Sequence, residues 1–271
     1  YEYKIGKYEV TIQQYTDFLN AVAQTDPYAL YNASMTTDLN TAGISRAGSD
    51  GAYTYSVIGS SGNKPITYVS WNNAARFANW MQNGQGSGST ETGAYTLNGV
   101  PNGSAPVKNP GAQFYIPTED QWYKAAYYSP TLNSGSGGYY TYATQSNIAS
   151  GNVIGSGANQ ANYQNGVYSV TQSSSYSSSQ NYLTDVGAFS NTASFYGTFD
   201  QSGNVYQWND LDGSARWQRG LRGGCWNDNA IQMSYSNHTS LDANLEAPSV
   251  GFRLAGLYST PVPELSLIHI S

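Results

Sequence analysis

The chain has few of the residues that build common catalytic and metal sites. Its 271 residues include one cysteine, Cys225, and two histidines, His238 and His269. A single cysteine excludes an intramolecular disulfide, two-cysteine redox chemistry and a cysteine-rich zinc site. Two histidines exclude a three-histidine metal site built from one copy of the chain.

Charged residues and long apolar runs are also scarce. Asp, Glu, Lys and Arg make up 10% of the sequence, against roughly 25% in a typical soluble domain. The net charge is −6 and no run of Lys or Arg occurs, which argues against a nucleic-acid partner because such binders carry a basic face. No run reaches the roughly 18 apolar residues that indicate a membrane-spanning helix.

Tyrosine and small polar residues take the place of charge. The sequence has 25 tyrosines and 29 glycines beside many Ser, Asn, Gln and Thr residues. This composition is typical of extracellular and envelope proteins, so we expect a protein that is secreted or held on the cell surface of a Gram-negative-type bacterium. No Pro/Gly/Ser-rich stretch has a complete domain on each side, and we therefore predict one domain.

The C-terminal end carries two unusual segments. Residues 260–264, Thr-Pro-Val-Pro-Glu, resemble the start of the sorting signal of PEP-CTERM proteins, and the end of a Pro-rich linker is the alternative. Residues 265–271 resemble the translation of a sequencing adapter. We therefore interpret 257–264 as a linker with a truncated sorting signal, and 265–271 as foreign to the natural protein. Membrane attachment would then depend on a missing C-terminal tail.

Three segments have the pattern of a capped amphipathic helix. Apolar residues recur at helical spacing after Thr11, and Thr11 and Gln14 have the spacing of a capping box. Thr118 and Gln121 repeat this spacing before a second apolar stripe. Ser70 precedes an alanine-rich segment and is a good N-cap. We predict a helix after each of these three N-caps.

The remainder is predicted to form short strands and long loops. Tyr3–Val10 alternates as a strand, and Gly251–Ala255 has the pattern of a final buried strand. Residues 83–111 and 129–194 are rich in Ser, Gly, Asn and Tyr, and we interpret both as insertions because loops of this length are unusual. Their tyrosines favour partial order, since disordered chains have few aromatic residues.

Six motifs across residues 1–256 resemble, in order, those of the formylglycine-generating-enzyme family, also called sulfatase-modifying factors. They are Gly6–Thr11, Pro65–Trp71, Tyr115–Trp122, Asp200–Trp208, Arg222–Trp226 and Val250–Leu254. The resemblance implies a domain over residues 1–256 with an irregular α+β fold related to C-type lectins. Such a fold has few helices, short twisted sheets and long loops.

The same resemblance bears on redox chemistry. In active members, a cysteine pair that follows the Arg-Gly-Gly-Ser motif binds copper(I) and oxidises a substrate cysteine. Counted from Arg222, these two positions fall on Asp228 and Met233, and Cys225 stands in place of the motif serine. Copper(I) prefers soft thiolates, so we do not expect copper as a cofactor.

Calcium and iron are the other metals that members of the resembled family bind. Family members bind structural calcium near a Gly-Asn-x-Trp-Glu-Trp motif, of which Asn204 is kept while Gln207 stands in place of the glutamate. This implies a weakened calcium site, or a turn role alone for Asn204. A related branch binds iron through a histidine-rich helical domain, which this chain lacks, and we expect His238 on a solvent-facing loop.

Hydrolase chemistry has little support in the sequence. No Gly-x-Ser-x-Gly elbow occurs. Glu9, Glu119, Asp200, Asp210 and Asp228 could form a paired-carboxylate glycosidase site by residue type only. Glu9 and Glu119 lie within the fold motifs, where we expect them to hold helix ends.

Residues 227–249 lie between the last two motifs. In the family this stretch lines the active-site surface, and in some non-enzymatic relatives it is a hypervariable ligand-binding face. Tyr, Asn, Ser and His make adaptable contact surfaces, so we predict a ligand face here, with an ordinary surface loop as the alternative. Its predicted contact residues are Asn227, Asp228, Asn229, Tyr235, Asn237 and His238.

Two functions follow from these observations. The first is a non-catalytic extracellular or surface-displayed binding or structural module, whose ligand is a glycan, a protein or another extracellular molecule. The second is an oxidoreductase of altered mechanism that uses Asp228, His238 or Cys225 around a metal. A solvent-open pocket at Asp228 and Met233 would favour ligand binding, whereas a filled, flat surface would favour a structural role.

Overall fold

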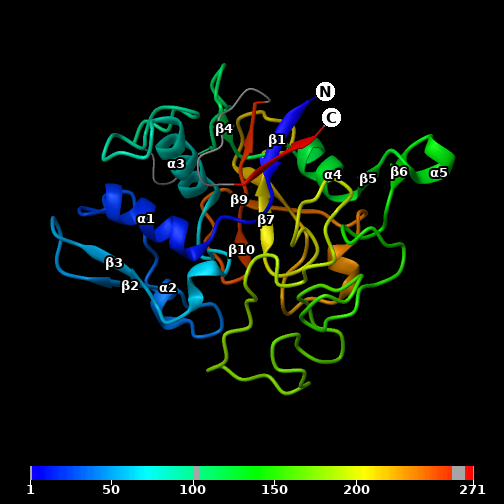
Figure 1. Cartoon of the computed structure of the whole chain (residues 1–271). Helices are drawn as coiled ribbons and strands as arrows, with labels where there is room; N and C mark the ends of the chain where they lie inside the picture. Colours follow the sequence, from blue (N-terminus) through cyan, green and yellow to red (C-terminus); the bar gives the residue numbers. More distant parts are fainter. Residues whose placement is uncertain (1, 100–103, 258–265, 271) are drawn as a thin grey trace.

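The structure is a computed structural model that describes residues 2–99, 104–257 and 266–270. The longest helices are α1 (Ile12–Val22), α3 (Trp71–Gln82) and α4 (Glu119–Tyr127). The shorter helical turns are α2 (Ser34–Thr37), η1 (Ser61–Asn63), α5 (Leu132–Gly135) and η2 (Ala230–Met233). In Figure 1, α1 and α3 lie on one side of the molecule, and α4 and α5 lie on the other.

The three long helices begin at the predicted caps. The Thr11 hydroxyl accepts a hydrogen bond from the Gln14 amide, and the Gln14 side chain accepts one from the Thr11 amide at 2.9 Å. Thr118 and Gln121 form the same reciprocal pair. Ser70 accepts from the backbone of the third helical residue. All three helix predictions are confirmed because the signals that start a helix are local.

Two four-stranded sheets carry the fold (Figure 1). The first sheet has the order β12-β1-β11-β4, with β1 (Tyr3–Gly6), β4 (Phe114–Tyr115), β11 (Ala255–Gly256) and β12 (Leu267–Ile270). The second sheet has the order β10-β7-β8-β9, with β7 (Tyr206–Asn209), β8 (Gln218–Arg222), β9 (Thr239–Asp242) and β10 (Val250–Gly251). Two hairpins complete the strands, β2 (Ile44–Ala47) with β3 (Thr54–Val57) and β5 (Tyr128–Ser129) with β6 (Gly138–Tyr139).

The predicted final strand over 251–255 is wrong in one respect, because the chain divides it between the two sheets. Val250 pairs in parallel with Tyr206 in the second sheet, while Ala255 pairs with β1 in the first. Between these strands, Arg253 is fully buried and donates to the carbonyl oxygens of Gly6 and Phe199 at 2.8 and 2.7 Å. These bonds hold the chain where it crosses between the sheets. The predicted strand over 3–10 is also shorter, since β1 ends at Gly6.

The main core lies where α1 and α3 meet the sheets. Phe77 of α3 lies 5.4 Å from both Phe18 and Phe252, measured between ring centroids, and all three rings are buried. Burying such a side chain contributes roughly 1.5–3 kcal/mol. This aromatic contact joins the first helix, the second long helix and the last motif of the sequence.

Most of the two predicted insertions is irregular, yet it is held by side-chain amides. Asn79 donates to the carbonyl oxygens of Thr90 and Tyr95 at 2.7 and 3.0 Å. Asn152 binds two carbonyl groups of the second insertion in the same way. Outside α5 and the β5–β6 hairpin, the described residues of both segments are therefore ordered without regular structure, and in Figure 1 the second forms the long green-to-yellow loops. Their status as insertions stays a prediction.

The C-terminal segments are described only in part. Residues 258–264 of the predicted linker and sorting signal lie outside the described residues. Leu267–Ile270 pair with β1, where Ile270 lies opposite Tyr3. This pairing does not test where residues 265–271 come from. Within residues 2–99, 104–257 and 266–270, no helix is long and apolar enough to span a bilayer.

Candidate functional site

The predicted ligand face connects β8 to β9 and then to β10, all in the second sheet. Arg222, the last residue of β8, is almost fully buried. It donates to the carbonyl oxygens of Tyr235 and Asn237 at 2.9 and 2.8 Å and pairs with the Glu119 carboxylate. The buried guanidinium of Arg222 therefore holds the backbone of this loop at Tyr235 and Asn237.

The structure brings most of the predicted contact residues to the surface. Asn227, Asn229, Tyr235 and His238 are exposed, and Tyr235 retains 42% of its accessible surface. His238 thus faces solvent, as expected. The remaining two predicted residues, Asp228 and Asn237, are half-buried.

Asp228 is bonded to the base of its own loop. Its carboxylate accepts from the Cys225 amide at 3.1 Å and from the Cys225 thiol at 3.2 Å. Burial raises the pKa of the thiol well above its usual range, and the charge of Asp228 adds to the shift. Tyr206 also hydrogen bonds Asp228, and its pKa is raised by burial and by this contact. The cysteine therefore stays a neutral thiol at neutral pH.

Met233 lies below the surface. Its side chain is fully buried and packs with Tyr142, Ala161 and Tyr163, and its carbonyl oxygen accepts from the Tyr127 hydroxyl at 3.1 Å. Since Met233 has no solvent contact, Asp228 and Met233 do not share a solvent-open pocket. The floor of the predicted ligand face is therefore filled at this point, which is the arrangement that we expected to favour a structural role.

A stack of aromatic rings lies beside the loop. Trp226 is parallel to Tyr182 within 4°, with ring centroids 4.8 Å apart. Tyr182 in turn stacks on Tyr176 at 6.0 Å, and Tyr176 is 56% exposed. Sequence reasoning missed this contact between the Arg222–Trp226 motif and the second predicted insertion. The tyrosine-rich composition of 168–182 was the available signal.

Asn204 and Gln207 do not fit the weakened calcium site. The Gln207 carbonyl oxygen accepts from the Trp122 indole at 2.8 Å and from the Arg253 guanidinium at 2.6 Å. The Asn204 carbonyl oxygen likewise accepts from two N–H groups. A calcium ion requires oxygen atoms that face it, and here both face N–H donors, one of them cationic. In the part of the chain that the structure describes, no group of three or more His, Cys, Asp or Glu side chains could hold a metal.

Gln207 belongs to a cluster that includes two acids, the buried Glu9 and the half-buried Asp200. Its side-chain N–H groups donate to the Glu9 carboxylate at 3.3 Å and to the Asp200 carbonyl oxygen at 2.8 Å. Burial raises the pKa of Asp200 to about 6. The pKa of Glu9 is also raised, by burial first and then by the charge of Asp200. Glu9 thus joins this cluster with Gln207 and Arg253, whereas we expected it at a helix end.

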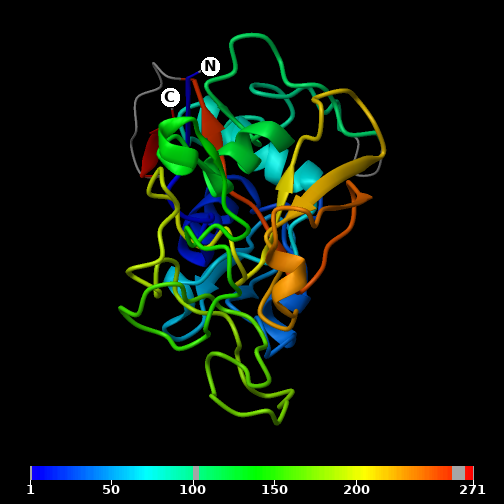
Figure 2. The same cartoon turned by 90° about the vertical axis from the view of Figure 1, so that its right-hand side faces the viewer.

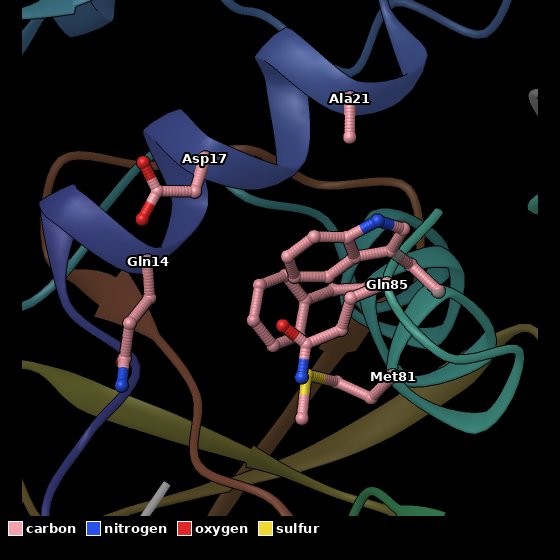
Figure 3. A pocket seen from close by; sticks show the side chains of 7 residues that line it. Gln14, Asp17, Ala21, Met81 and Gln85 are labelled. Carbon is pink, nitrogen blue, oxygen red and sulfur yellow. The ribbon is translucent and has the colours of Figure 1, made fainter. Parts of the chain in front are cut away.

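A cavity of about 220 Å³ opens between α1 and α3 (Figure 3). Its apolar wall comes from α3 and its polar rim mainly from α1. The lining residues are Gln14, Asp17, Ala21, Phe77, Trp80, Met81 and Gln85. None of them belongs to residues 227–249, so this cavity is separate from the predicted ligand face.

A sequence model of the sulfatase-modifying factor enzyme 1-like domain matches residues 1–256. The chain belongs to this family. The match spans all six motifs and ends before the C-terminal segments. No curated protein sequence matches this family member significantly.

Three solved structures resemble this sulfatase-modifying factor domain. The crystal structure of CarF has a TM-score of 0.54 at 20% identity and covers 95% of this chain and 87% of that chain. PvdO from Pseudomonas aeruginosa has a TM-score of 0.50 at 17% identity and covers 94% and 80%. Treponema denticola variable protein 1 has a TM-score of 0.49 at 18% identity and covers 93% and 84%. The first of these, with the family match, confirms the predicted mixed fold of few helices and short sheets.

Proposed function

We propose that this family member is a non-catalytic binding or structural module that acts outside the cell, with its ligand face in residues 227–249. The observation that carries the proposal is the state of the two positions that the resemblance assigns to the copper-binding cysteines. Asp228 is bonded to Cys225, and Met233 is fully buried. Neither offers the accessible thiolate that copper(I) prefers.

The only thiol of the chain supports the same conclusion. Cys225 is 2% exposed, and its raised pKa leaves it protonated at neutral pH. A thiolate is the form that binds metals and attacks substrates. Cys225 therefore acts as a small buried residue that donates a hydrogen bond to Asp228.

The exposed part of the loop supports a binding role. Asn227, Asn229, Tyr235 and His238 present amide, phenol and imidazole groups to solvent. These groups form hydrogen bonds and ring contacts at a small entropic cost, since each has few rotatable bonds. Arg222 fixes the loop that carries them, which limits the ordering that a ligand must impose.

The alternative is an oxidoreductase of altered mechanism. One observation favours it, namely the distance of 3.2 Å between the Cys225 sulfur and the Asp228 carboxylate, which places a soft and a hard donor together. His238 faces solvent instead of completing a buried donor set. We therefore rank this function second.

One experiment separates the two functions. The purified chain is incubated with copper(I), oxygen and a cysteine-containing sulfatase peptide, and the peptide is analysed by mass spectrometry. We expect no formylglycine product from the chain or from a Cys225→Ser variant. Product from the chain that disappears in the variant would establish the oxidoreductase. Elemental analysis of protein purified without chelator provides a second test, since stoichiometric copper or iron would contradict the proposal.

A further inference from the structure

A second surface feature lies next to the ligand face. It is an open groove of about 470 Å³ between α4, the β5–β6 hairpin and the loop before residue 197. Its lining residues are Lys124, Tyr128, Pro130, Tyr139, Phe195 and Tyr196. The rings of Tyr139 and Phe195 are 51% and 38% exposed. Large aromatic side chains with this much exposure in one groove are characteristic of a binding surface.

A chain of side-chain contacts through Tyr123 and the buried Arg222 joins the groove to the predicted ligand face. The Tyr123 ring lies 5.0 Å from that of Tyr139, and the Arg222 guanidinium carbon lies 4.9 Å from the Tyr123 centroid. Arg222 binds the Tyr235 carbonyl oxygen, and the Tyr235 amide donates to Thr141 at 2.9 Å. The hairpin and the orange η2 turn occupy the same side of the molecule, which faces the viewer in Figure 2.

The orientation of the rings indicates the shape of the ligand. Tyr139 is tilted by 50° to Tyr123 and by 60° to Tyr128, and Phe195 is perpendicular to Tyr196 within 1°. Rings that face several directions do not form the parallel platform on which flat bases stack. Their faces point in different directions, which suits a ligand made of several linked, non-planar rings.

The charge of the groove indicates its chemistry. Lys124 is the one charged residue among the six that line it, and the whole chain carries a net charge of −6. A polyanion would be repelled by the net charge, and phosphate groups would need more basic residues. Tyrosine hydroxyls and one ammonium group beside aromatic faces match a ligand with apolar C–H faces and many hydroxyl groups.

We propose that the groove binds an uncharged polysaccharide strand, which continues from the groove onto Tyr235 of the ligand face. The sugar rings stack on Tyr139 and Phe195, and Lys124 and the tyrosine hydroxyls bind the hydroxyl groups of the sugar. This inference rests on the proposed binding function and adds to it both a ligand class and a second half of the site.

The test uses isothermal titration calorimetry with four hexasaccharide probes, made of β-1,4-glucose, β-1,3-glucose, β-1,4-mannose and β-1,4-N-acetylglucosamine. We expect at least one to bind the full chain. The double variant Tyr139→Ala/Phe195→Ala should bind it about tenfold more weakly or worse, because exposed aromatic anchors dominate such sites. A Tyr235→Ala variant should weaken binding less. The matched control is Trp217→Ala, which removes a ring that is 58% exposed outside the groove and should bind normally.

Several outcomes would overturn the inference. These are the absence of binding for all four probes at millimolar concentration, binding that the double variant leaves unchanged, and binding of only a polyuronate or a proline-rich peptide. Thermal unfolding of each variant checks that the fold is intact. Formylglycine production would instead contradict the proposed function, so the two failures are distinguishable.

Discussion

Asp200 is half-buried, and its carboxyl group lies beside the buried cluster of Glu9, Gln207 and Arg253. The Gly187 amide donates to it at 2.6 Å, and burial still raises its pKa from 3.8 to about 6. The folded state therefore binds more protons than the unfolded state between these two pH values. By linkage, the contribution of Asp200 to the free energy of unfolding is largest below pH 3.8 and falls as the pH rises toward 6.

This shift predicts a pH dependence that one substitution removes. An Asp200→Asn variant can still accept from Gly187, but it does not ionise. Between pH 4 and pH 7 the free energy of unfolding of the wild-type chain should fall by on the order of 2–3 kcal/mol, since one pKa unit corresponds to about 1.4 kcal/mol. The variant should not show this fall. Urea unfolding of both proteins at several pH values measures the difference. Parallel stability curves for the two proteins would contradict the role of Asp200.

Cys225 gives a second prediction at the residue scale. Its thiol is 2% exposed with a raised pKa, and reaction with a disulfide reagent requires an accessible thiolate. At pH 8 we expect the folded chain to react very slowly with a thiol-specific chromogenic disulfide, and the urea-unfolded chain to react at once with about one equivalent. Fast reaction of the folded chain would show that the thiol is accessible and would favour the oxidoreductase.

At the scale of elements, Arg222 connects β8, α4 and the loop of the predicted ligand face. Its guanidinium is 6% exposed and contacts the Glu119 carboxylate and two backbone carbonyl oxygens. The side chain of lysine has no planar fork and cannot make all of these contacts at once. The arrangement of the predicted ligand face therefore depends on one side chain outside it.

An Arg222→Lys variant should loosen the loop selectively. We expect its free energy of unfolding to fall by roughly 2–4 kcal/mol, because breaking a buried ion pair leaves its partners unsatisfied. Hydrogen exchange at residues 234–239 should accelerate more than exchange in α3. The matched control is Arg216→Lys, which alters an exposed ion pair with Asp212 and should leave the free energy of unfolding nearly unchanged, because solvent screens such pairs. Equal effects of both variants would contradict the argument.

The elements also show what the sequence can predict. Thr11, Ser70 and Thr118 predict helix starts because each cap involves residues three positions apart. The motif around Arg222 predicts a position in the fold, yet its partner Glu119 is 103 residues away in the sequence. Likewise, the contacts of Gln207 come from three distant segments. A motif therefore identifies the fold, but the buried state of Met233 and the groove at Tyr139 depend on how distant segments pack.

At the scale of the whole molecule, the first sheet joins the two ends of the chain. β1 has β11 on one side and β12 on the other. The family match stops at residue 256, the last residue of β11. Ile270 nevertheless is fully buried and packs with Tyr3, Ile5 and Ala125. The family domain and the C-terminal strand therefore make separable contributions to the same sheet.

A chain that ends at residue 257 tests this separation. β1 keeps its pairs with β11 through Lys4 and Ile5, so the truncated chain should fold and unfold cooperatively. Its free energy of unfolding should be lower by roughly 2–4 kcal/mol, which is the contribution of one or two buried isoleucine side chains. An Ile270→Ala variant of the full chain should show much of the same decrease. Chemical denaturation followed by tryptophan fluorescence measures both. Failure of the truncated chain to fold would show that residues 258–271 are part of the domain, and that its boundary lies beyond residue 256.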